Sequence, residues 1–261
     1  MILPISVHNR FLARLAQRYR ARAQHHRRLP WFGYTLSALN VIAIAFFVFD
    51  AALGRTAKDL PHRLVTIAGD ITDIGKLATI LTVTVTVIAV SLLIGKRLSN
   101  VRRRYRMAIL TQMAIYLSLS VVAASVTVHI LKLAIGRARP LLYDSTGIFR
   151  FDPFNGGFLY ESFPSGHSAH VGAVFVALAL LFPRFRLLFV GLGLWLGATR
   201  IIIGVHYPSD VMAGLALGAW FAFATAVVFA RYGIIFTLSP EGWPRPRFIG
   251  MTIFQHSARR R

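Results

Sequence analysis

The stretch TILTVTVTVIAV, residues 79–90, decides between two classes of fold. Its content of valine, isoleucine and threonine is typical of a β-strand. The apolar run extends, however, over residues 77–95 without a charged side chain, which is close to the ~20 residues that a helix needs to cross a ~30 Å hydrocarbon core. An open strand edge in lipid leaves backbone groups without hydrogen-bond partners. The stretch therefore predicts a membrane-spanning helix.

Five further apolar stretches could also span a bilayer, although the fourth is short unless it begins within the turn of residues 164–167. The sequence therefore predicts an all-α fold, a six-transmembrane-helix bundle. The expected spans are Trp31–Leu53, Leu77–Gly95, Met107–Gly136, Ser168–Phe182, Leu187–Val205 and Val211–Phe236. The chain is 56% hydrophobic and its mean hydropathy is +0.59, which is too apolar for an ordinary soluble domain of this length. Because there is no cysteine, disulfides and thiolate chemistry are excluded.

The basic residues predict the orientation of these spans. The chain holds 30 Lys and Arg against 9 Asp and Glu, a net charge of +21. If the N-terminus is inside and the spans alternate, the inner segments hold 21 of the 30 basic residues and a single acid, Glu241. Since an excess of Lys and Arg marks the cytoplasmic side, both termini are expected in the cytoplasm. Nucleic-acid binding by the basic N-terminus is the alternative explanation of the charge, but no nucleic-acid partner is expected.

Two basic segments flank the predicted membrane domain. In residues 1–30 the apolar side chains share one helical face and arginines occupy most of the rest, which is typical of an amphipathic helix on an anionic membrane surface; a solvated basic tail remains the alternative. The apolar run that follows is too long for a cleaved secretory signal. The expected organisation is a basic amphipathic cytoplasmic segment 1–30, a six-helix membrane domain 31–236 and a cytoplasmic tail 237–261.

Ionisable residues gather where the predicted spans reach the outer side. These residues are Lys132, Arg137 and Arg139 at the outer end of the third span, His167 at the start of the fourth, Arg200 near the end of the fifth, and His206 and Asp210 at the turn into the sixth. Any one of them alone could be a cation that snorkels to the headgroups or an interfacial histidine. Charges at membrane depth are costly, however, and usually form pairs or mark a functional site. We therefore expect them to surround one point.

This set of residues suits phosphoryl transfer. Fixed cations bind phosphate oxygens, and arginine adds bidentate hydrogen bonds. The helix after Pro164, Ser165 and Gly166 begins with free backbone N–H groups and a positive dipole end, although Ser165 could be only a helix cap. One histidine can attack phosphorus while the other protonates the departing oxygen, and Asp210 can orient the ring of His206. No second carboxylate accompanies the histidines, so no metal is expected.

At these residues the chain resembles the type 2 phosphatidic acid phosphatase superfamily, which also includes vanadium haloperoxidases and bacterial acid phosphatases. The three parts of its signature are Lys132 with Arg139-Pro140, Pro164-Ser165-Gly166-His167, and Thr199-Arg200 with His206 and Asp210. Thr199 stands where the family usually has serine and retains a hydroxyl group. The resemblance covers about residues 77–230 and implies a haloperoxidase-like helical core of the integral-membrane branch.

The resemblance also implies roles for individual residues. His206 would form a phosphohistidine, Asp210 would hydrogen-bond its other nitrogen, and His167 would protonate the leaving group. Lys132, Arg139, Ser165, Gly166 and Arg200 would bind the phosphoryl oxygens. No metal or other cofactor would take part. Arg137 lies outside the signature and is expected to touch a headgroup or only the membrane, and His170 is expected to be structural or lipid-facing.

The predicted function is that of a lipid phosphatase in a bacterial inner membrane with its site at the periplasmic face. The expected partners are a membrane lipid phosphate and the bilayer. Candidate substrates are undecaprenyl pyrophosphate, phosphatidylglycerol phosphate, phosphatidic acid and the phosphates of lipid A. Two alternatives remain open, a phosphotransferase that passes the phosphoryl group to another lipid and a non-catalytic lipid-binding protein. The second alternative would need the cations but not the two histidines and Asp210.

Overall fold

The computed structural model describes residues 29–56 and 60–247, together with residues 13, 16–17 and 19. The expected amphipathic helix of residues 1–30 lies almost wholly outside the described residues, as do residues 248–261 of the expected tail. The α-helices are α2 (Trp31–Ile44), α3 (Asp50–Thr56), α4 (His62–Thr72), α5 (Leu77–Arg97), α6 (Val101–Ile135), α7 (Tyr143–Thr146), α8 (Gly166–Leu181), α9 (Arg186–Ile202) and α10 (Pro208–Tyr232). Shorter turns are η1 (Ala45–Phe49), η2 (Asp73–Gly75), η3 (Pro140–Leu142), η4 (Phe158–Tyr160) and η5 (Pro183–Phe185).

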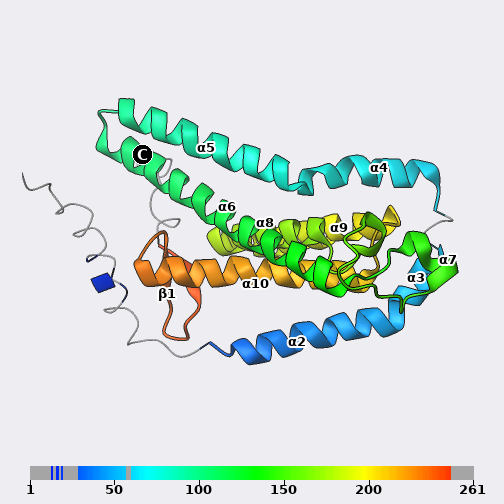
Figure 1. The fold of residues 1–261 in the computed structure, drawn as a ribbon. Helices are drawn as coiled ribbons and strands as arrows, with labels where there is room; N and C mark the ends of the chain where they lie inside the picture. Colours follow the sequence, from blue (N-terminus) through cyan, green and yellow to red (C-terminus); the bar gives the residue numbers. More distant parts are fainter. Residues whose placement is uncertain (1–12, 14–15, 18, 20–28, 57–59, 248–261) are drawn as a thin grey trace, which may run out of the picture.

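The long helices run side by side along an elongated bundle (Figure 1). Five of them are long and apolar enough to cross a membrane, namely Trp31–Thr56, Leu77–Arg97, Val101–Ile135, Pro183–Ile202 and Pro208–Tyr232. The sixth expected span corresponds to α8, which has 16 residues and falls short of the ~20 that a full crossing needs. The all-α membrane bundle is therefore confirmed, with five full-length helices and a shorter central one among the described residues.

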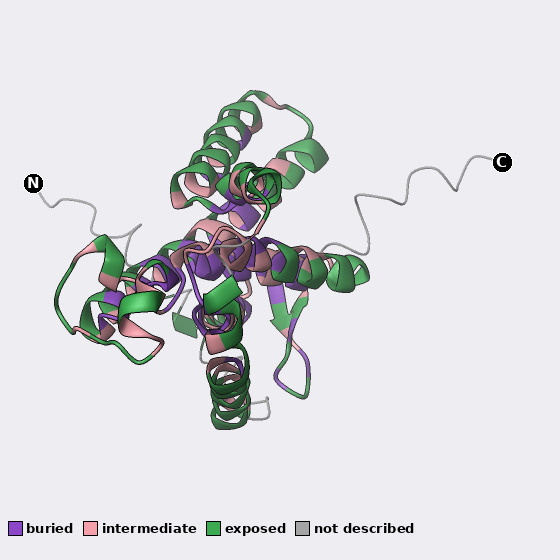
Figure 2. Cartoon of the chain, turned by 90° about the vertical axis from the view of Figure 1, so that its right-hand side faces the viewer, coloured by how far each residue is buried: buried purple, intermediate pink, exposed green. Residues whose placement is uncertain are grey.

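Buried residues concentrate at the centre of the bundle, and the peripheral helices are largely exposed (Figure 2). No residue of α2 is buried, and on α5 only Thr84 and Ser91 are buried. The side chains that α2 and α5 expose include Leu36, Ile44 and Val83. Apolar surface on this scale is typical of helices that face lipid.

The closest helix packing lies between α8 and α10 at the centre of the bundle. Gly214 and Gly218 form a GxxxG pattern on α10, which in membranes lets two backbones approach closely. A Cβ atom at Gly214 would overlap the carbonyl oxygen of Ser165, and one at Gly218 would overlap that of Ala169. The two glycines thus hold the first turn of α8 directly against the first turns of α10.

The start of α6 differs from the sequence expectation. The helix begins at Val101 instead of Met107, because the Asn100 side chain accepts hydrogen bonds from the backbone N–H groups of Arg102 and Arg103 at 3.0 and 3.2 Å. An asparagine at this position caps a helix N-terminus. The arginines that were expected in an inner loop therefore belong to the helix, next to Lys96 and Arg97 at the end of α5.

The last helix ends at Tyr232, earlier than expected, with Gly233 in the left-handed region at a φ of 68°. Strands β1 (Phe236–Leu238) and β2 (Pro244–Pro246) then form an antiparallel hairpin. Phe236 is fully buried and its ring contacts that of Tyr116 at a centroid distance of 5.0 Å. The hairpin lies at the end of the bundle where α5 meets α6, and α3 and α7 lie at the opposite end (Figure 1).

Candidate phosphate-binding and catalytic site

The sequence-predicted site residues meet at the end of the bundle that carries α3 and α7. Lys132 lies in the last turn of α6, His167 in the first turn of α8, and Arg200 in the last turn of α9. His167 interacts electrostatically with both Arg200 and His206, and Lys132 does so with Arg139, Arg200 and Asp210. Residues from four separate parts of the chain thus lie close enough to interact electrostatically.

His206 is a buried, neutral imidazole in the loop between α9 and α10. The residue is 3% exposed. Burial lowers the pKa of His206 to about 4, with a further lowering from Arg139 and Lys132 that the nearby Asp210 carboxylate opposes. At neutral pH the ring therefore keeps a free lone pair, as a nucleophile requires.

Asp210 is completely buried and makes three hydrogen bonds. It accepts them from Ser162 Oγ at 2.5 Å, from the Tyr207 backbone N–H at 2.9 Å and from Arg137 Nη1 at 2.6 Å. Its Oδ2 lies 3.6 Å from His206 Nδ1, which is too long for a hydrogen bond. The expected hydrogen bond between these two side chains is therefore not formed in this structure, although Nδ1 is the ring nitrogen that faces the carboxylate.

Lys132 and Arg139 both donate to carbonyl oxygens of the loop before α8. Lys132 Nζ donates to Glu161 O at 2.8 Å. Arg139 Nε donates to Phe158 O at 2.7 Å and its Nη2 to Glu161 O at 3.3 Å, while the guanidinium stacks 3.9 Å from the Phe158 ring centre. Burial lowers the pKa of Arg139, and the Asp210 and Glu161 carboxylates oppose this effect. Neutral carbonyl partners leave both positive charges available to an anion.

Arg200 also has a neutral partner. Its Nη1 donates to Thr72 Oγ1, at the end of α4, at 3.3 Å, and its buried Nε has no hydrogen-bond partner among the described residues. In the described part of the chain neither Lys132, Arg139 nor Arg200 forms a salt bridge with a carboxylate. Three cations with neutral partners make a site that favours a phosphate dianion.

The first turn of α8 is held in place by its own serines. Ser165 is the N-cap, and its Oγ accepts from the Ser168 backbone N–H at 3.4 Å and from Ser168 Oγ at 2.9 Å. A Cβ atom on Gly166 would lie 3.9 Å from Lys132 Cε. The lysine stem therefore passes beside the helix N-terminus, where both the ammonium group and the helix dipole attract an anion. The capping role of Ser165 is seen directly.

Arg137 is the main residue that the sequence analysis misjudged. It is 1% exposed and forms salt bridges with Asp50 Oδ2 at 2.8 Å and with Asp210 Oδ1 at 2.6 Å. Burial alone would lower the pKa of Arg137, but the carboxylates of Asp210 and Asp50 outweigh it and raise the pKa. The expectation that Arg137 touches a headgroup or only the membrane is wrong. The available signal was Asp50, a carboxylate inside the first apolar span that needs a partner.

Known proteins share both the sequence and the fold. The model of the PAP2 superfamily matches residues 113–233. Lipid A 1-phosphatase of Rhizobium etli is 40% identical over 216 residues, which cover 83% of this chain and 92% of that protein. The chain belongs to the PAP2 superfamily. With its apolar helices it is a membrane-embedded phosphatase of that superfamily, as the sequence predicted.

Two further comparisons extend this PAP2 assignment. Lipid A 1-phosphatase of Rhizobium johnstonii is 40% identical over 241 residues, which cover 90% of this chain and 95% of that protein. A crystal structure described as the first transmembrane PAP2 type phosphatidylglycerolphosphate phosphatase, from Bacillus subtilis, superposes with a TM-score of 0.52 at 21% identity. It covers 74% of this chain and 92% of that one. This second likeness shows the fold alone.

Helix α4 and the turn η2, which lie between the first span and α5, contribute residues that the sequence analysis did not predict. Thr72 ends α4 and contacts Arg200, and a Cβ atom at Gly75 would lie 3.6 Å from His167 Cδ2. His170 is 7% exposed, and its Nδ1 lies 3.3 Å from Gly75 O. Of the two roles expected for His170, the structural one therefore holds. No periodic apolar pattern of full-span length marks this segment, and the sequence analysis therefore did not predict α4.

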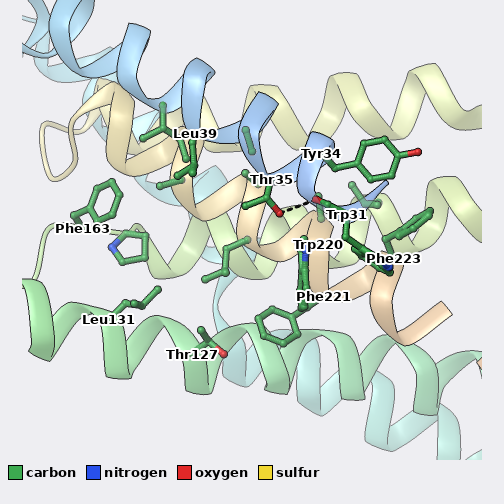
Figure 3. A pocket seen from close by; sticks show the side chains of 18 of the residues that line it. Trp31, Tyr34, Thr35, Leu39, Thr127, Leu131, Phe163, Trp220, Phe221 and Phe223 are labelled. Atoms are coloured by element: carbon green, nitrogen blue, oxygen red, sulfur yellow. Dashed lines mark hydrogen bonds between the residues drawn. The ribbon is translucent and has the colours of Figure 1, made fainter. Parts of the chain in front are cut away.

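A wide apolar groove runs along the PAP2 bundle, separate from these residues. It measures about 740 Å³ and is lined by residues of α2, α6, α8 and α10 together with Phe163, Pro164 and Trp243. Figure 3 shows Phe163 near one end of the groove and Trp31 and Phe223 near the other. None of the predicted site residues lines it. Among the described residues no group of three or more His, Asp or Glu side chains could hold a metal ion, and the metal-free reaction stays a prediction.

Proposed function

We propose that this chain removes the 1-phosphate of lipid A, in a bacterial inner membrane, by way of a phosphohistidine on His206. The observation that carries the substrate is the extent of the likeness to the two lipid A 1-phosphatases. Identity of 40% over 83% and 90% of the chain reaches well beyond residues 113–233, the part that the superfamily shares. A relative named undecaprenyl-diphosphatase, from Sulfolobus acidocaldarius, is 35% identical but matches only 26% of the chain.

In the first step His206 attacks phosphorus. Its Nδ1 faces Asp210, so Nε2 forms the new bond to phosphorus while the bond from phosphorus to the lipid oxygen breaks. His167 enters this step as an imidazolium, gives that oxygen its proton and becomes neutral. Lys132, Arg139 and Arg200 stabilise the charge that spreads over the three other phosphoryl oxygens.

In the second step a water molecule attacks the phosphorus of the phosphohistidine. His167, left neutral by the first step, takes a proton from this water, and the bond from phosphorus to Nε2 breaks. The products are inorganic phosphate and His206 with its lone pair restored. The buried neutral state of His206 supports this cycle, because an imidazole protonated at neutral pH would first have to lose its proton.

The proposed site lies at the periplasmic face. The basic turn between α5 and α6 lies at one end of the bundle, and the candidate site lies at the end with α3 and α7 (Figure 1). If the basic end is cytoplasmic, the site reaches the outer leaflet and both termini remain inside.

The test is release of inorganic phosphate by the purified protein in detergent. The panel contains lipid A, phosphatidylglycerol phosphate, phosphatidic acid and undecaprenyl pyrophosphate, each also assayed with His206→Ala. We expect kcat/KM for lipid A to exceed that for every other lipid by about tenfold or more. Preference for another lipid would overturn the substrate. Equal rates for the wild type and His206→Ala would overturn the enzymatic function, and appearance of a phosphorylated acceptor lipid in place of free phosphate would support the phosphotransferase.

A further inference from the structure

We propose that Asp50, acting through Arg137, is a positioning residue that keeps a net negative charge beside the ring of His206. The inference rests on the proposed function, in which His206 is the nucleophile. It assigns a catalytic influence to the first span, which lies before the region that the superfamily model matches.

The first step is the geometry of a closed ion-pair network. Arg137 donates from Nη2 to Asp50 Oδ2 at 2.8 Å and from Nη1 to Asp210 Oδ1 at 2.6 Å. Asp50 and Asp210 are fully buried and Arg137 is 1% exposed. The guanidinium is also held between rings, 4.8 Å from the centre of Phe46 and 4.4 Å from that of Tyr207. Its orientation is therefore fixed from both sides.

The second step is the link from Asp50 to the start of α10. Asp50 Oδ1 accepts from the Ser209 backbone N–H at 2.9 Å, and Asp50 Oδ2 accepts from Ser209 Oγ at 2.5 Å. Arg137 Nη1 donates to the same Ser209 Oγ at 2.7 Å, if that oxygen's proton goes to Asp50. Asp50 thus binds the turn of α10 that carries Asp210, and it does so from α3, in the first span.

The third step is the balance of charge. Arg137 paired with Asp210 alone would leave no net charge beside His206. Since Arg137 is shared with Asp50, the three groups together carry one net negative charge. Attack of Nε2 on phosphorus draws electron density from the ring and makes Nδ1–H more positive. A negative charge next to Nδ1 stabilises that state, and charge interactions are strong in a buried site.

The deciding variant is Asp50→Asn, which keeps the size of the side chain and one oxygen to accept from Ser209 but removes the charge. We expect kcat to fall about 10- to 100-fold. KM and the inhibition constant for inorganic phosphate, which binds without forming a bond to His206, should change by no more than about threefold, because Lys132, Arg139 and Arg200 are untouched. The thermal unfolding midpoint in detergent shows whether each variant is folded.

Two further variants separate charge from structure. Ser209→Ala removes hydrogen bonds of the network but none of its charges, and its loss of kcat should be smaller than that of Asp50→Asn. The double variant Asp50→Asn with Arg137→Gln restores one net negative charge, so its kcat should exceed that of Asp50→Asn by about tenfold. If Asp50→Asn does not fold, the folded double variant decides alone: we expect its kcat to stay within about tenfold of the wild type.

Three results would overturn the inference. The first is a folded Asp50→Asn variant with the kcat of the wild type, and the second is a loss of kcat in Ser209→Ala as large as that in Asp50→Asn. The third is a folded double variant that is no more active than Asp50→Asn. A double variant with kcat more than about 100-fold below the wild type also overturns it. His206→Ala, assayed in parallel, separates the two failures. If it is as active as the wild type, the proposed function fails; if it is inactive and Asp50→Asn is fully active, only the role of Asp50 fails.

Discussion

Arg137 and Arg139 lie two positions apart in the sequence, but their surroundings are opposite. Arg137 is bound by two buried carboxylates, Asp50 and Asp210. Among the residues that the structure describes, Arg139 donates only to backbone carbonyl oxygens, those of Phe158, Glu161 and Val205. A carboxylate neutralises an arginine and a carbonyl does not. The comparison teaches that the charge of the partner, more than the place in a motif, decides whether a buried cation serves architecture or is left for a ligand.

The same contrast extends to the other cations of the site. Lys132 and Arg200 share the neutral surroundings of Arg139, with a carbonyl and a hydroxyl as their partners. Burying cations without counter-ions is costly. Since Lys132 and Arg139 are buried and Arg200 is partly buried near them, with no paired carboxylate among the described residues, binding of an anion between them would offset this cost. We therefore refer to Lys132, Arg139 and Arg200 as the phosphate-binding cations and expect them to respond to mutation differently from Arg137.

The largest effect is expected on kcat when the nucleophile is removed, while binding of the lipid is retained. His206→Ala should lower kcat by about 10⁴-fold or more, because the nucleophile is lost. The phosphate-binding cations remain in place, so binding of the lipid substrate should persist. Phosphate release and binding of labelled lipid measure the two quantities. The matched control is His62→Ala, an exposed histidine on α4, which should retain activity. Loss of activity in both variants would point to a general effect of histidine removal.

The second prediction tests whether Arg139 and Arg200 bind the phosphoryl group while Arg137 stabilises the fold. Arg139→Gln and Arg200→Gln should each lower kcat/KM by about 10- to 100-fold, since each removes charge-assisted hydrogen bonds to the phosphoryl group. Both should also raise the inhibition constant for vanadate. Arg137→Gln leaves two buried carboxylates without their partner and should mainly lower the thermal unfolding midpoint. A weaker vanadate affinity in Arg137→Gln, with no change in Arg139→Gln, would reverse the assignment.

A smaller effect is expected from the packing that positions the site. Gly214→Ala places a Cβ atom against the Ser165 carbonyl, so α8 and α10 must move apart and His167 must shift relative to Asp210. We expect a loss of kcat/KM of about tenfold and a lower unfolding midpoint. Gly191→Ala is the control, because nothing lies within 4 Å of its added Cβ atom. Equal behaviour of the two variants would show that the close α8–α10 contact does not position the site.

The smallest effect concerns pH and the buried imidazole. The pKa of His206 in the folded protein, about 4, lies below the ~6.5 of an unfolded histidine. Protonation therefore favours the unfolded chain, and stability attributable to His206 is lost as pH falls from about 6.5 towards 4. Between pH 7.5 and 5 the unfolding midpoint of the wild type should fall by a few degrees more than that of His206→Gln. Equal pH sensitivity would show that His206 titrates normally.

The sequence was sufficient for those features that apolar length and charge determine. Uninterrupted apolar runs gave the long helices, and the ends of these runs placed Lys132, His167 and Arg200 at one level. The start of α6 was misjudged because its position depends on a single capping side chain, Asn100, whose effect outweighs the cost of arginines at the helix end. Helix α4 was missed because it has only 11 residues and mixes polar with apolar side chains, so it does not form an apolar run of the length of a span.

The Arg137 network could not be predicted for a different physical reason. Asp50 and Arg137 are separated by 87 positions, and no spacing rule relates a residue of the first span to one after the third. Their pairing depends on how the first span packs against α10, which only the folded structure shows. The same holds for Asp210, whose motif position predicted a hydrogen bond to His206 but whose oxygens are used by Ser162, Tyr207 and Arg137.

The most direct test of the account is to trap the phosphorylated enzyme. Wild-type protein is mixed with lipid A that carries ³²P at its 1-phosphate, quenched in alkali to preserve phosphohistidine, and digested for mapping of the label. The account predicts label on the peptide that contains His206 and none in His206→Ala. Label on another residue, or steady phosphate release by the wild type with no labelled intermediate at His206 under rapid quench, would contradict it.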